Sequence, residues 1–343
     1  MVSPVLLSRL VFTIIFFPMN MSTQLLVFAL ACAILLNCYV EATKVLGASR
    51  LLKQYPMILS HDAATSMLDK KLSVVEAYTQ TQQDGLLSSQ LSCGARAFDY
   101  RPFLRKDGSL VAHHGSVQVP VLSRDSTEDI ISWLAQPAHS DELVLLYLSH
   151  FQADGETDTQ ESQRCIDATA TLLKDMGIAS IGYGGDCSPL ATLTVSEAVS
   201  RGHLPSGGSL LAVFDCVNEN FNPKVNCWGM NGIHEYSCYG KNRDVAWGAM
   251  QSYVNSTAIP LATPADNLWM LQAHWQSSDE SVPLGDLHHS SVLKDEKEAG
   301  VNAWLAQTLR DRALPFETLN LVELDNVCDG GLEVLAALQG AYM

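Results

Sequence analysis

The chain has 343 residues, of which 47% are hydrophobic and 17% charged, and this composition excludes an intrinsically disordered protein. Its formal net charge of −16, from 37 acidic and 21 basic residues, comes without any Lys/Arg cluster of the kind that binds a phosphate backbone. We therefore exclude nucleic acid as a partner, and net charge does not draw the chain to an anionic membrane surface.

The N-terminal region is apolar and is predicted to lie outside the folded domain. Two apolar blocks, residues 4–18 and 25–36, are separated by a polar break. The second block has the length of a signal-peptide core, and compact residues precede a cleavage position after Ala42. We expect residues 1–42 to be a signal peptide of a secreted, extracellular protein. We expect residues 43–343 to form a single domain. The alternative to cleavage is an N-terminal anchor that stays attached and leaves this domain lumenal or extracellular.

Cysteine usage fits an oxidising compartment. Seven of the nine cysteines lie beyond the predicted signal peptide, and no C-x-x-C pair suggests zinc or thioredoxin chemistry. Cys216, Cys227 and Cys238 share one loop-like stretch, where we expect local disulfide pairing. The odd number leaves one thiol unpaired or paired between chains. Asn255 begins a sequon for N-glycosylation, which has meaning only in a secreted protein.

Short apolar strands alternate with helical patterns along the rest of the chain. The predicted strands are Met57–Ser60, Ala95–Tyr100, Leu110–His113, Leu143–Ser149, Ser209–Phe214, Leu268–Ala273 and Leu319–Leu324. The predicted helices lie near 74–90, 125–135, 158–176, 193–201, 243–254, 296–311 and 330–339. This alternation predicts an α/β fold, a TIM-type (β/α) barrel that is distorted or incompletely closed. A doubly wound open sheet is the alternative, but its Gly-rich turn after a first strand is missing.

Ionisable residues gather at the ends of the predicted strands. Those at or just beyond a strand end are His61, Asp62, Asp99, Arg101, His113, His114, Asp215, His274 and Asp325. In a parallel barrel these ends meet at one face, where active sites are built. Two histidines and an arginine suit the cleavage of a phosphodiester. One imidazole removes a proton from the attacking hydroxyl, the other protonates the leaving oxygen, and the guanidinium binds phosphate oxygens.

Three pieces of sequence form the most specific pattern. They are His61-Asp62 after an apolar strand, Gly-Ala-Arg-Ala-Phe-Asp-Tyr-Arg ending at Arg101, and a His-His-Gly run that contains His114. Together they resemble the X region of phosphatidylinositol-specific phospholipase C, of the bacterial type and of small eukaryotic proteins with only an X domain. The resemblance is strong from about Pro56 to Val119 and limited to the strand pattern beyond. It implies an enzyme that releases a cyclic inositol phosphate and diacylglycerol.

The resemblance also implies roles for individual residues. His61 would be the general base that activates the inositol 2-hydroxyl, and Asp325 would orient it. His114 would be the general acid on the glycerol oxygen, and Asp62 would support this leaving-group side. His113 is predicted to be only the sequence neighbour of the catalytic His114, because adjacent residues of a strand face opposite sides.

Arg101 would bind the phosphate, with Asp99 helping to hold the cluster. In calcium-dependent members of the family an acidic ligand occupies this part of the site. A guanidinium there does the ion's electrostatic work, and the two cations would repel each other at one phosphate. We therefore expect no catalytic metal and no cofactor. Asp62, Asp99 and Asp325 as calcium ligands stay an alternative.

Two strand ends depart from the bacterial pattern. Ser149 and His150 stand where the bacterial enzymes carry a basic residue that contacts inositol, and Asp215 stands where they place an arginine. These residues, together with His274 and Trp275, are predicted to line the substrate pocket. The substrate is expected to be a phospholipid or another phosphodiester, with transient contact at a membrane surface, and its head group stays open.

Two other functions remain open at this point. One is a metal-dependent glycerophosphodiester or sphingolipid phosphodiesterase of the same superfamily, although no Glu-rich cluster lies near His61. The other is a barrel that binds a lipid or an inositol phosphate without turnover. The altered strand ends favour the second, whereas the retained histidines and Arg101 favour an enzyme.

Overall fold

The computed structural model describes residues 49–68, 79–156, 161–219, 251–252, 254–255, 266–274, 291–313 and 319–340. Residues 50–343 form one compact unit and residues 1–49 another. The predicted signal peptide or anchor, residues 1–42, lies outside the described residues. Among the helices that are described, none combines the length and the apolar character needed to cross a membrane.

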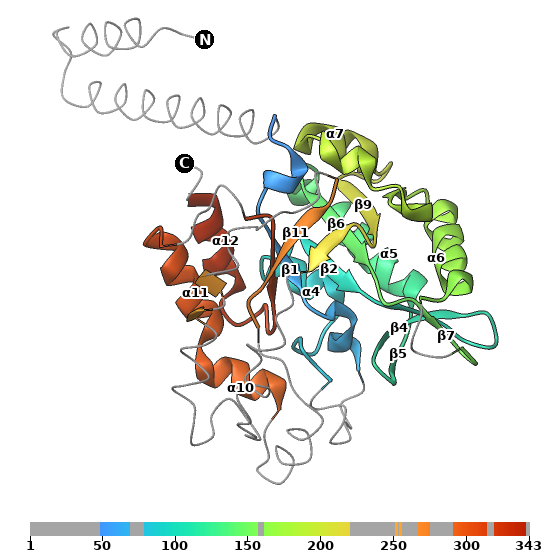
Figure 1. Ribbon diagram of the computed structural model, residues 1–343, viewed down its shortest axis with the longest axis horizontal. Helices are drawn as coiled ribbons and strands as arrows, with labels where there is room; N and C mark the ends of the chain where they lie inside the picture. Colours follow the sequence, from blue (N-terminus) through green and yellow to red (C-terminus); the bar gives the residue numbers. More distant parts are fainter. Residues whose placement is uncertain are drawn as a thin grey trace, which may run out of the picture. The chain divides into compact units, whose positions relative to one another are not determined.

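A sheet of eight parallel strands forms the centre of the larger unit (Figure 1). In spatial order its strands are β10 (Val217–Glu219), β11 (Leu268–Gln272), β12 (Leu321–Leu324), β1 (Met57–Ser60), β2 (Ala97–Tyr100), β6 (Leu143–Leu148), β9 (Ser209–Phe214) and β8 (Ala179–Ile181). Within the described residues no pairing joins the two outer strands, β8 and β10. The prediction of an incompletely closed α/β barrel is confirmed.

Helices lie around this sheet, except α10 (Val292–Ala299), which lies apart from the strands (Figure 1). The described α-helices are α4 (Leu87–Ser92), α5 (Ser123–Leu134), α6 (Gln163–Asp175), α7 (Val195–Gly202), α10, α11 (Val301–Arg310) and α12 (Gly331–Gly340). The helix predicted near 296–311 is two helices, because Gly300 adopts a left-handed φ of 65° that ends α10 and starts α11. The helix predicted near 74–90 is wrong over 79–86, where the chain is irregular.

A second, smaller sheet lies beside the barrel. Its order is β5 (Val117–Leu122), β4 (Leu110–His114), β3 (Pro102–Leu104) and β7 (Gln152–Ala153). The prediction of 110–113 as a barrel strand was wrong, since β4 pairs antiparallel with both β3 and β5. The reason is the tight turn at Gly108, with φ 86°, which reverses the direction of the chain between β3 and β4. A parallel crossover needs a much longer connection.

The barrel strands are apolar on both faces because each face is buried. Alternate residues point into the barrel, where Leu59, Tyr147 and Val213 belong to the inner core. Their neighbours, such as Ile58 and Phe98, belong to the core between sheet and helices. Burial on both sides explains why these strands read as continuous apolar runs. It also means that a polar residue at an inward position needs a buried partner.

Two disulfides tie loops to the barrel. Cys93 pairs with Cys328, and Cys187 pairs with Cys216. The expectation of a local disulfide for Cys216 was therefore wrong, and the other two cysteines of that stretch lie outside the described residues. The Cys187–Cys216 bridge joins the segment after β8 to the segment before β10, the two outer strands of the sheet. Cys165 is a buried free thiol, and burial raises its pKa to about 12.

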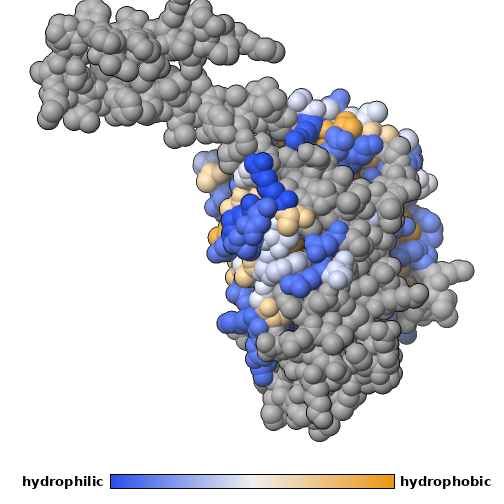
Figure 2. Space-filling model, turned by 60° about the vertical axis from the view of Figure 1, so that its left-hand side comes forward, coloured by the Kyte–Doolittle hydropathy of each residue, from blue (hydrophilic) through white to orange (hydrophobic). Residues whose placement is uncertain are grey.

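Hydrophilic side chains cover most of the described surface on the face drawn in Figure 2, with apolar ones scattered among them. The large apolar side chains exposed in the described part of the chain are Leu86, Leu122, Tyr183 and Leu332. They lie in four separate parts of the chain. Single exposed apolar side chains of this kind are ordinary and do not define a binding surface.

Candidate active site

Side chains alternate between the two faces of β1 and β2, and this alternation places two ionisable side chains on the inner side of the barrel. Leu59 and Ala97 belong to the inner core. His61 and Asp99 follow them by two residues, which is the repeat of a strand face. Both are buried, with exposures of 5% and 2%. These two adjacent strands therefore deliver an imidazole and a carboxylate to the same end of the barrel.

The strands β12 and β11, which follow β1 on its other side, also place ionisable side chains on the inner side of the barrel. In β12, Leu321 belongs to the inner core, and Glu323 and Asp325 follow at the same parity. In β11, Met270 belongs to the inner core and His274 follows at that parity. All three ionisable side chains are buried. Glu323 is not among the residues predicted for the site, although a lone acid inside the apolar run Leu-Val-Glu-Leu signals a buried polar contact.

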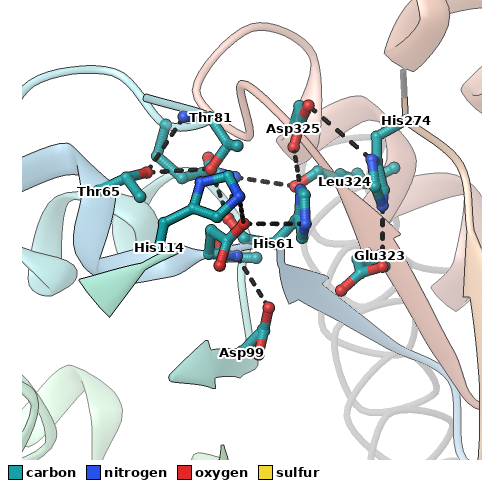
Figure 3. A network of polar contacts seen from close by, with 12 residues as sticks. His61, Thr65, Thr81, Asp99, His114, His274, Glu323, Leu324 and Asp325 are labelled. Atoms are coloured by element: carbon teal, nitrogen blue, oxygen red, sulfur yellow. Dashed lines mark hydrogen bonds and ion pairs between the residues drawn. The ribbon is translucent and has the colours of Figure 1, made fainter. Parts of the chain in front are cut away.

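His61 has a carboxylate at each of its ring nitrogens (Figure 3). Nδ1 donates to Oδ1 of Asp325 at 2.7 Å, and Nε2 lies 3.1 Å from Oδ2 of Asp62. Burial lowers the pKa of His61, but the negative charges of Asp62, Asp325 and Glu323 outweigh it and raise this pKa to about 10. His61 is therefore an imidazolium in the free protein at neutral pH.

Asp62 links the histidines to the arginine. It adopts a left-handed conformation, with φ 43°, immediately after the strand end. Its Oδ1 lies 2.8 Å from Nε of Arg101, and Oδ2 of Asp99 lies 2.9 Å from Nη2 of the same guanidinium. Burial raises the pKa of Asp62, but Arg101, His114 and His61 together hold it well below its usual range. The carboxylate is thus charged at neutral pH.

Arg101 is a partly exposed cation of the cluster. Its side chain keeps 17% of its surface exposed, whereas that of Asp62 has none. Burial lowers the pKa of Arg101, but Asp62 and Asp99 raise it further and keep the group charged. A planar guanidinium fixed by two carboxylates presents its free edge in one orientation, which suits two phosphate oxygens.

His114 enters the cluster from the antiparallel hairpin rather than from a barrel strand. Its Nε2 lies 3.3 Å from Oδ2 of Asp62, and Nδ1 donates to the carbonyl of Thr79 at 3.0 Å. Its ring centroid is 6.3 Å from that of His61, and 29% of its side chain is exposed. His113 points away, with its ring nitrogens 2.9 Å from the Gly115 carbonyl and 2.7 Å from that of His150.

Two polar side chains from the irregular segment 79–86, Thr81 (labelled in Figure 3) and Gln82, hold the backbone at the site. Thr81 Oγ1 donates to the carbonyl of His61 at 2.8 Å. Gln82 Nε2 donates to the carbonyls of His61 and Leu324, at 3.1 Å and 2.9 Å. Sequence reasoning missed both residues, because an amide and a hydroxyl in a predicted helix carry no signal of such long-range contacts.

The predicted pocket residues occupy the ends of β6 and β9, on the far side of β2 from His61. Ser149 is buried, and its hydroxyl donates to Oδ1 of Asp99 at 3.4 Å and lies 2.8 Å from Nδ1 of His150. His150 and Asp215 are exposed and both adopt a left-handed φ. Burial raises the pKa of Asp215, against the opposing effect of His150. Trp275, also predicted for the pocket, lies outside the described residues.

His274, predicted for the same pocket, lies behind His61 instead of at the barrel mouth. The two rings stack with centroids 3.9 Å apart and an angle of 20° between their planes. The His274 side chain has no exposed surface, and its Nε2 donates to Oε2 of Glu323 at 2.9 Å. The cluster thus contains a second histidine–carboxylate pair behind the first.

Two sets of donors in the cluster lie close enough to share a metal ion. They are His61, His274 and Asp325, and His61, Asp99 and Glu323. A transition metal needs lone pairs that converge at about 2.0–2.3 Å. The lone pairs of stacked imidazoles run side by side, so the first set fits poorly. In the second set, Asp99 already neutralises Arg101, and a cation beside that guanidinium would be repelled.

No family model matches the sequence, and no curated protein sequence matches it significantly. Solved structures do match. The phosphatidylinositol-specific phospholipase C of Staphylococcus aureus superposes with a TM-score of 0.56 at 14% identity, over 87% of this chain and 96% of that chain. The enzyme from Listeria monocytogenes gives a TM-score of 0.53 at 11% identity, over 86% and 95%. Identities this low establish the fold and not the activity. The protein therefore has the fold of the bacterial phosphatidylinositol-specific phospholipases C.

Proposed function

We propose that the protein is a phosphodiesterase of the phosphatidylinositol phospholipase C type. One observation carries this proposal: a single carboxylate, that of Asp62, contacts both imidazoles and the guanidinium. It lies 3.1 Å from His61, 3.3 Å from His114 and 2.8 Å from Arg101. A base, an acid and a phosphate-binding cation around one point are the groups that an in-line displacement at phosphorus needs.

His61 is the general base in this proposal. Its Nδ1 is held by Asp325 at 2.7 Å, so Nε2, which has the longer contact of 3.1 Å to Asp62, is the nitrogen that takes the proton of the inositol 2-hydroxyl. That oxygen forms a bond to phosphorus as the proton moves to Nε2. Asp325 stabilises the imidazolium that results, and only the neutral fraction of His61 can begin the reaction.

Arg101 and His114 act on the phosphate and on the leaving group. The guanidinium binds the non-bridging oxygens and offsets the charge that builds up as the new bond forms. His114 donates a proton to the glycerol oxygen as the bond from phosphorus to that oxygen breaks. The products are a cyclic inositol phosphate and diacylglycerol. Because Arg101 supplies the positive charge, the proposal includes no catalytic metal.

The substrate in this proposal is a phospholipid with an inositol head group, taken at a membrane surface in a transient contact. We further propose that the protein is secreted after removal of residues 1–42. Two disulfides support an oxidising compartment. Asn255, the acceptor of the glycosylation sequon, is exposed.

The proposal is tested with the full secreted protein on phosphatidylinositol vesicles in excess chelator. We expect wild type to release diacylglycerol, His114→Ala to be strongly impaired, and the control His203→Ala, at an exposed histidine, to match wild type. Equal rates for wild type and His114→Ala would end the proposal. Activity lost in chelator and restored by calcium or magnesium would favour the metal-dependent alternative. Binding without product would favour a non-catalytic barrel.

A further inference from the structure

The pair formed by His274 and Glu323 has no part in the reaction as proposed above, yet it is among the most buried groups of the site. The side chains are 0% and 2% exposed, and their contact, from Nε2 to Oε2, measures 2.9 Å. Burying an imidazole and a carboxylate costs free energy unless each satisfies the other. An apolar pair would fill the same inward positions of β11 and β12 without that cost. The groups around the pair must therefore explain why this position holds a polar pair.

The surroundings are the ring of His61. His274 stacks on it at a centroid distance of 3.9 Å and an interplanar angle of 20°. Figure 3 shows His274 and Glu323 on one side of His61, with His114 on the other side. A ring contacted by Asp325 at Nδ1 and by Asp62 at Nε2 can still rotate about the axis that joins these two contacts. A flat ring packed against its face removes this freedom, so the stack sets the plane in which Nε2 points to substrate.

Asp325 connects the two histidines at their Nδ1 atoms. Its Oδ1 accepts from His61 at 2.7 Å, and its Oδ2 lies 3.9 Å from Nδ1 of His274. One carboxylate therefore faces both rings of the stack. A displacement of His274 would reach His61 through two routes, the ring face and the shared carboxylate. With no exposed side-chain surface, His274 has no route to the substrate itself.

We propose that His274, held by Glu323, is a positioning residue that fixes the ring plane of the base His61. The role of His61 as the base rests on the proposed function. The contribution of His274 is geometric: it keeps Nε2 within reach of the attacking hydroxyl. A misplacement of about 1 Å in such a group costs about 100-fold in rate.

The first test compares His274→Phe, which keeps a flat ring, with His274→Ala, which removes it. We expect kcat of His274→Ala to fall about 100-fold with KM within about twofold of wild type. His274→Phe should retain most of the rate, and His203→Ala serves as the control for loss of an exposed histidine. A rise in KM for His274→Ala would indicate a substrate contact and overturn the proposal. Equal loss in the Phe and Ala variants would do the same.

The second test follows the charge of Glu323. The groups that face His61 are Asp62, Asp325, Glu323, His114, His274, Asp99 and Arg101. Glu323 is one of the carboxylates that raise the pKa of His61. Glu323→Gln keeps the shape of the pair and should move the rising limb of the pH profile of kcat/KM to lower pH. An unmoved limb would separate Glu323 from the base and contradict the proposal.

A third measurement needs no turnover. In the free protein, the Nδ1 proton of His61 can be followed by NMR as it exchanges with water. Loss of the stack in His274→Ala should speed this exchange at least about tenfold, because the ring opens more often. His274→Phe should leave it nearly unchanged. If wild type shows no activity on any inositol lipid, the proposed function fails while this exchange still decides the positioning role. Identical exchange in wild type and His274→Ala would overturn it.

Discussion

Nδ1 of His61 lies 2.7 Å from Oδ1 of Asp325, although 264 positions separate the two residues in the chain. Strand pairing brings them together, because β1 and β12 are neighbours and Ser60 is in register with Leu324. Each ionisable residue follows its strand end by one position, so both arrive at the same level of the barrel. The register of two parallel strands thus sets the orientation of the base.

Asp325→Asn tests this contact. The amide keeps the size of the side chain but can donate to Nδ1, which favours the tautomer with the proton on Nε2 and blocks the base. We expect kcat to fall by about 10⁴-fold, the loss found when such an orienting acid is replaced by its amide. Steady-state kinetics and a circular dichroism spectrum are the measurements. A rate within threefold of wild type, with the fold retained, would show that Asp325 does not orient the base.

His114→Ala tests the general acid through the leaving group. Without His114, departure of an alkoxide becomes slow, whereas a nitrophenolate leaves without help from an acid. We expect a loss of about 10²–10⁴-fold on the phospholipid, in line with the usual contribution of a positioned acid, and a much smaller loss on a nitrophenyl ester of inositol phosphate. His203→Ala, at an exposed histidine, is the control. Equal losses on the two substrates would assign His114 another role.

Arg101→Lys tests the phosphate-binding cation. A lysine keeps the charge but cannot hold Asp62 and Asp99 while presenting a planar edge to two oxygens. We expect kcat/KM to fall by about 10²–10³-fold, comparable with the loss of one transition-state donor elsewhere. Arg124→Lys, in the exposed pair with Glu128, gives the matched control. Recovery of the Arg101→Lys variant by added calcium would instead support a metal site.

The pKa of His61 predicts how stability changes with pH. The pKa is about 10 in the folded protein and 6.5 in the unfolded chain. The protonated ring therefore stabilises the fold fully below pH 6.5, and this stabilisation disappears as pH rises towards 10. Urea unfolding should show that His61→Asn loses less free energy of unfolding than wild type between pH 6.5 and 10. Parallel losses in the two proteins would place the pKa of His61 near its ordinary value.

The same pKa predicts the alkaline activity of the free enzyme. Only neutral His61 can accept the proton, so on a nitrophenyl ester of inositol phosphate, whose leaving group needs no acid, kcat/KM should rise with pH until the pKa of His61 is passed. The measurement is a pH profile of kcat/KM at substrate concentrations well below KM. A rising limb that is complete near pH 6 would mean that the carboxylates around His61 act on it less than their distances indicate.

The Cys93–Cys328 disulfide predicts a stability effect. Its two cysteines are 235 positions apart in the chain, and Cys328 follows Asp325 by three positions. Replacing both cysteines by alanine should lower the free energy of unfolding by about 2–5 kcal/mol, as for other native disulfides. Urea unfolding of the variant and of wild type measures the difference. An unchanged midpoint would mean that the loop is held by its hydrogen bonds alone, such as the one from Val327 N to Gln82 Oε1 at 3.0 Å.

The barrel could be predicted because its strands are buried on both faces. Runs such as Leu143–Leu148 and Ser209–Phe214 read as strands without any knowledge of their partners. The position of the ionisable residues followed from the same reading, since parallel strands end at one face. The hairpin was misread because Leu110–His114 has the same apolar character as a barrel strand. Only the turn at Gly108 separates the two cases.

The supporting contacts could not be predicted, because they join residues far apart in sequence. Gln82 donates to Leu324 across 242 positions, and neither residue type signals the contact. The disulfide partners likewise depend on how loops meet in space. Glu323 differs from these, since an acid in an apolar strand must find a buried partner. That argument predicts a partner for Glu323, and the structure identifies it as His274.

The most direct test of the proposed reaction is phosphorus NMR of the products from phosphatidylinositol in excess chelator. We expect a cyclic inositol phosphate as the first product of wild type, with no dependence on added calcium or magnesium. We expect His61→Ala to form this product at least about 10²-fold more slowly, the usual contribution of a general base. An acyclic phosphate as the first product, or a cyclic one formed equally fast by His61→Ala, would contradict the proposed reaction.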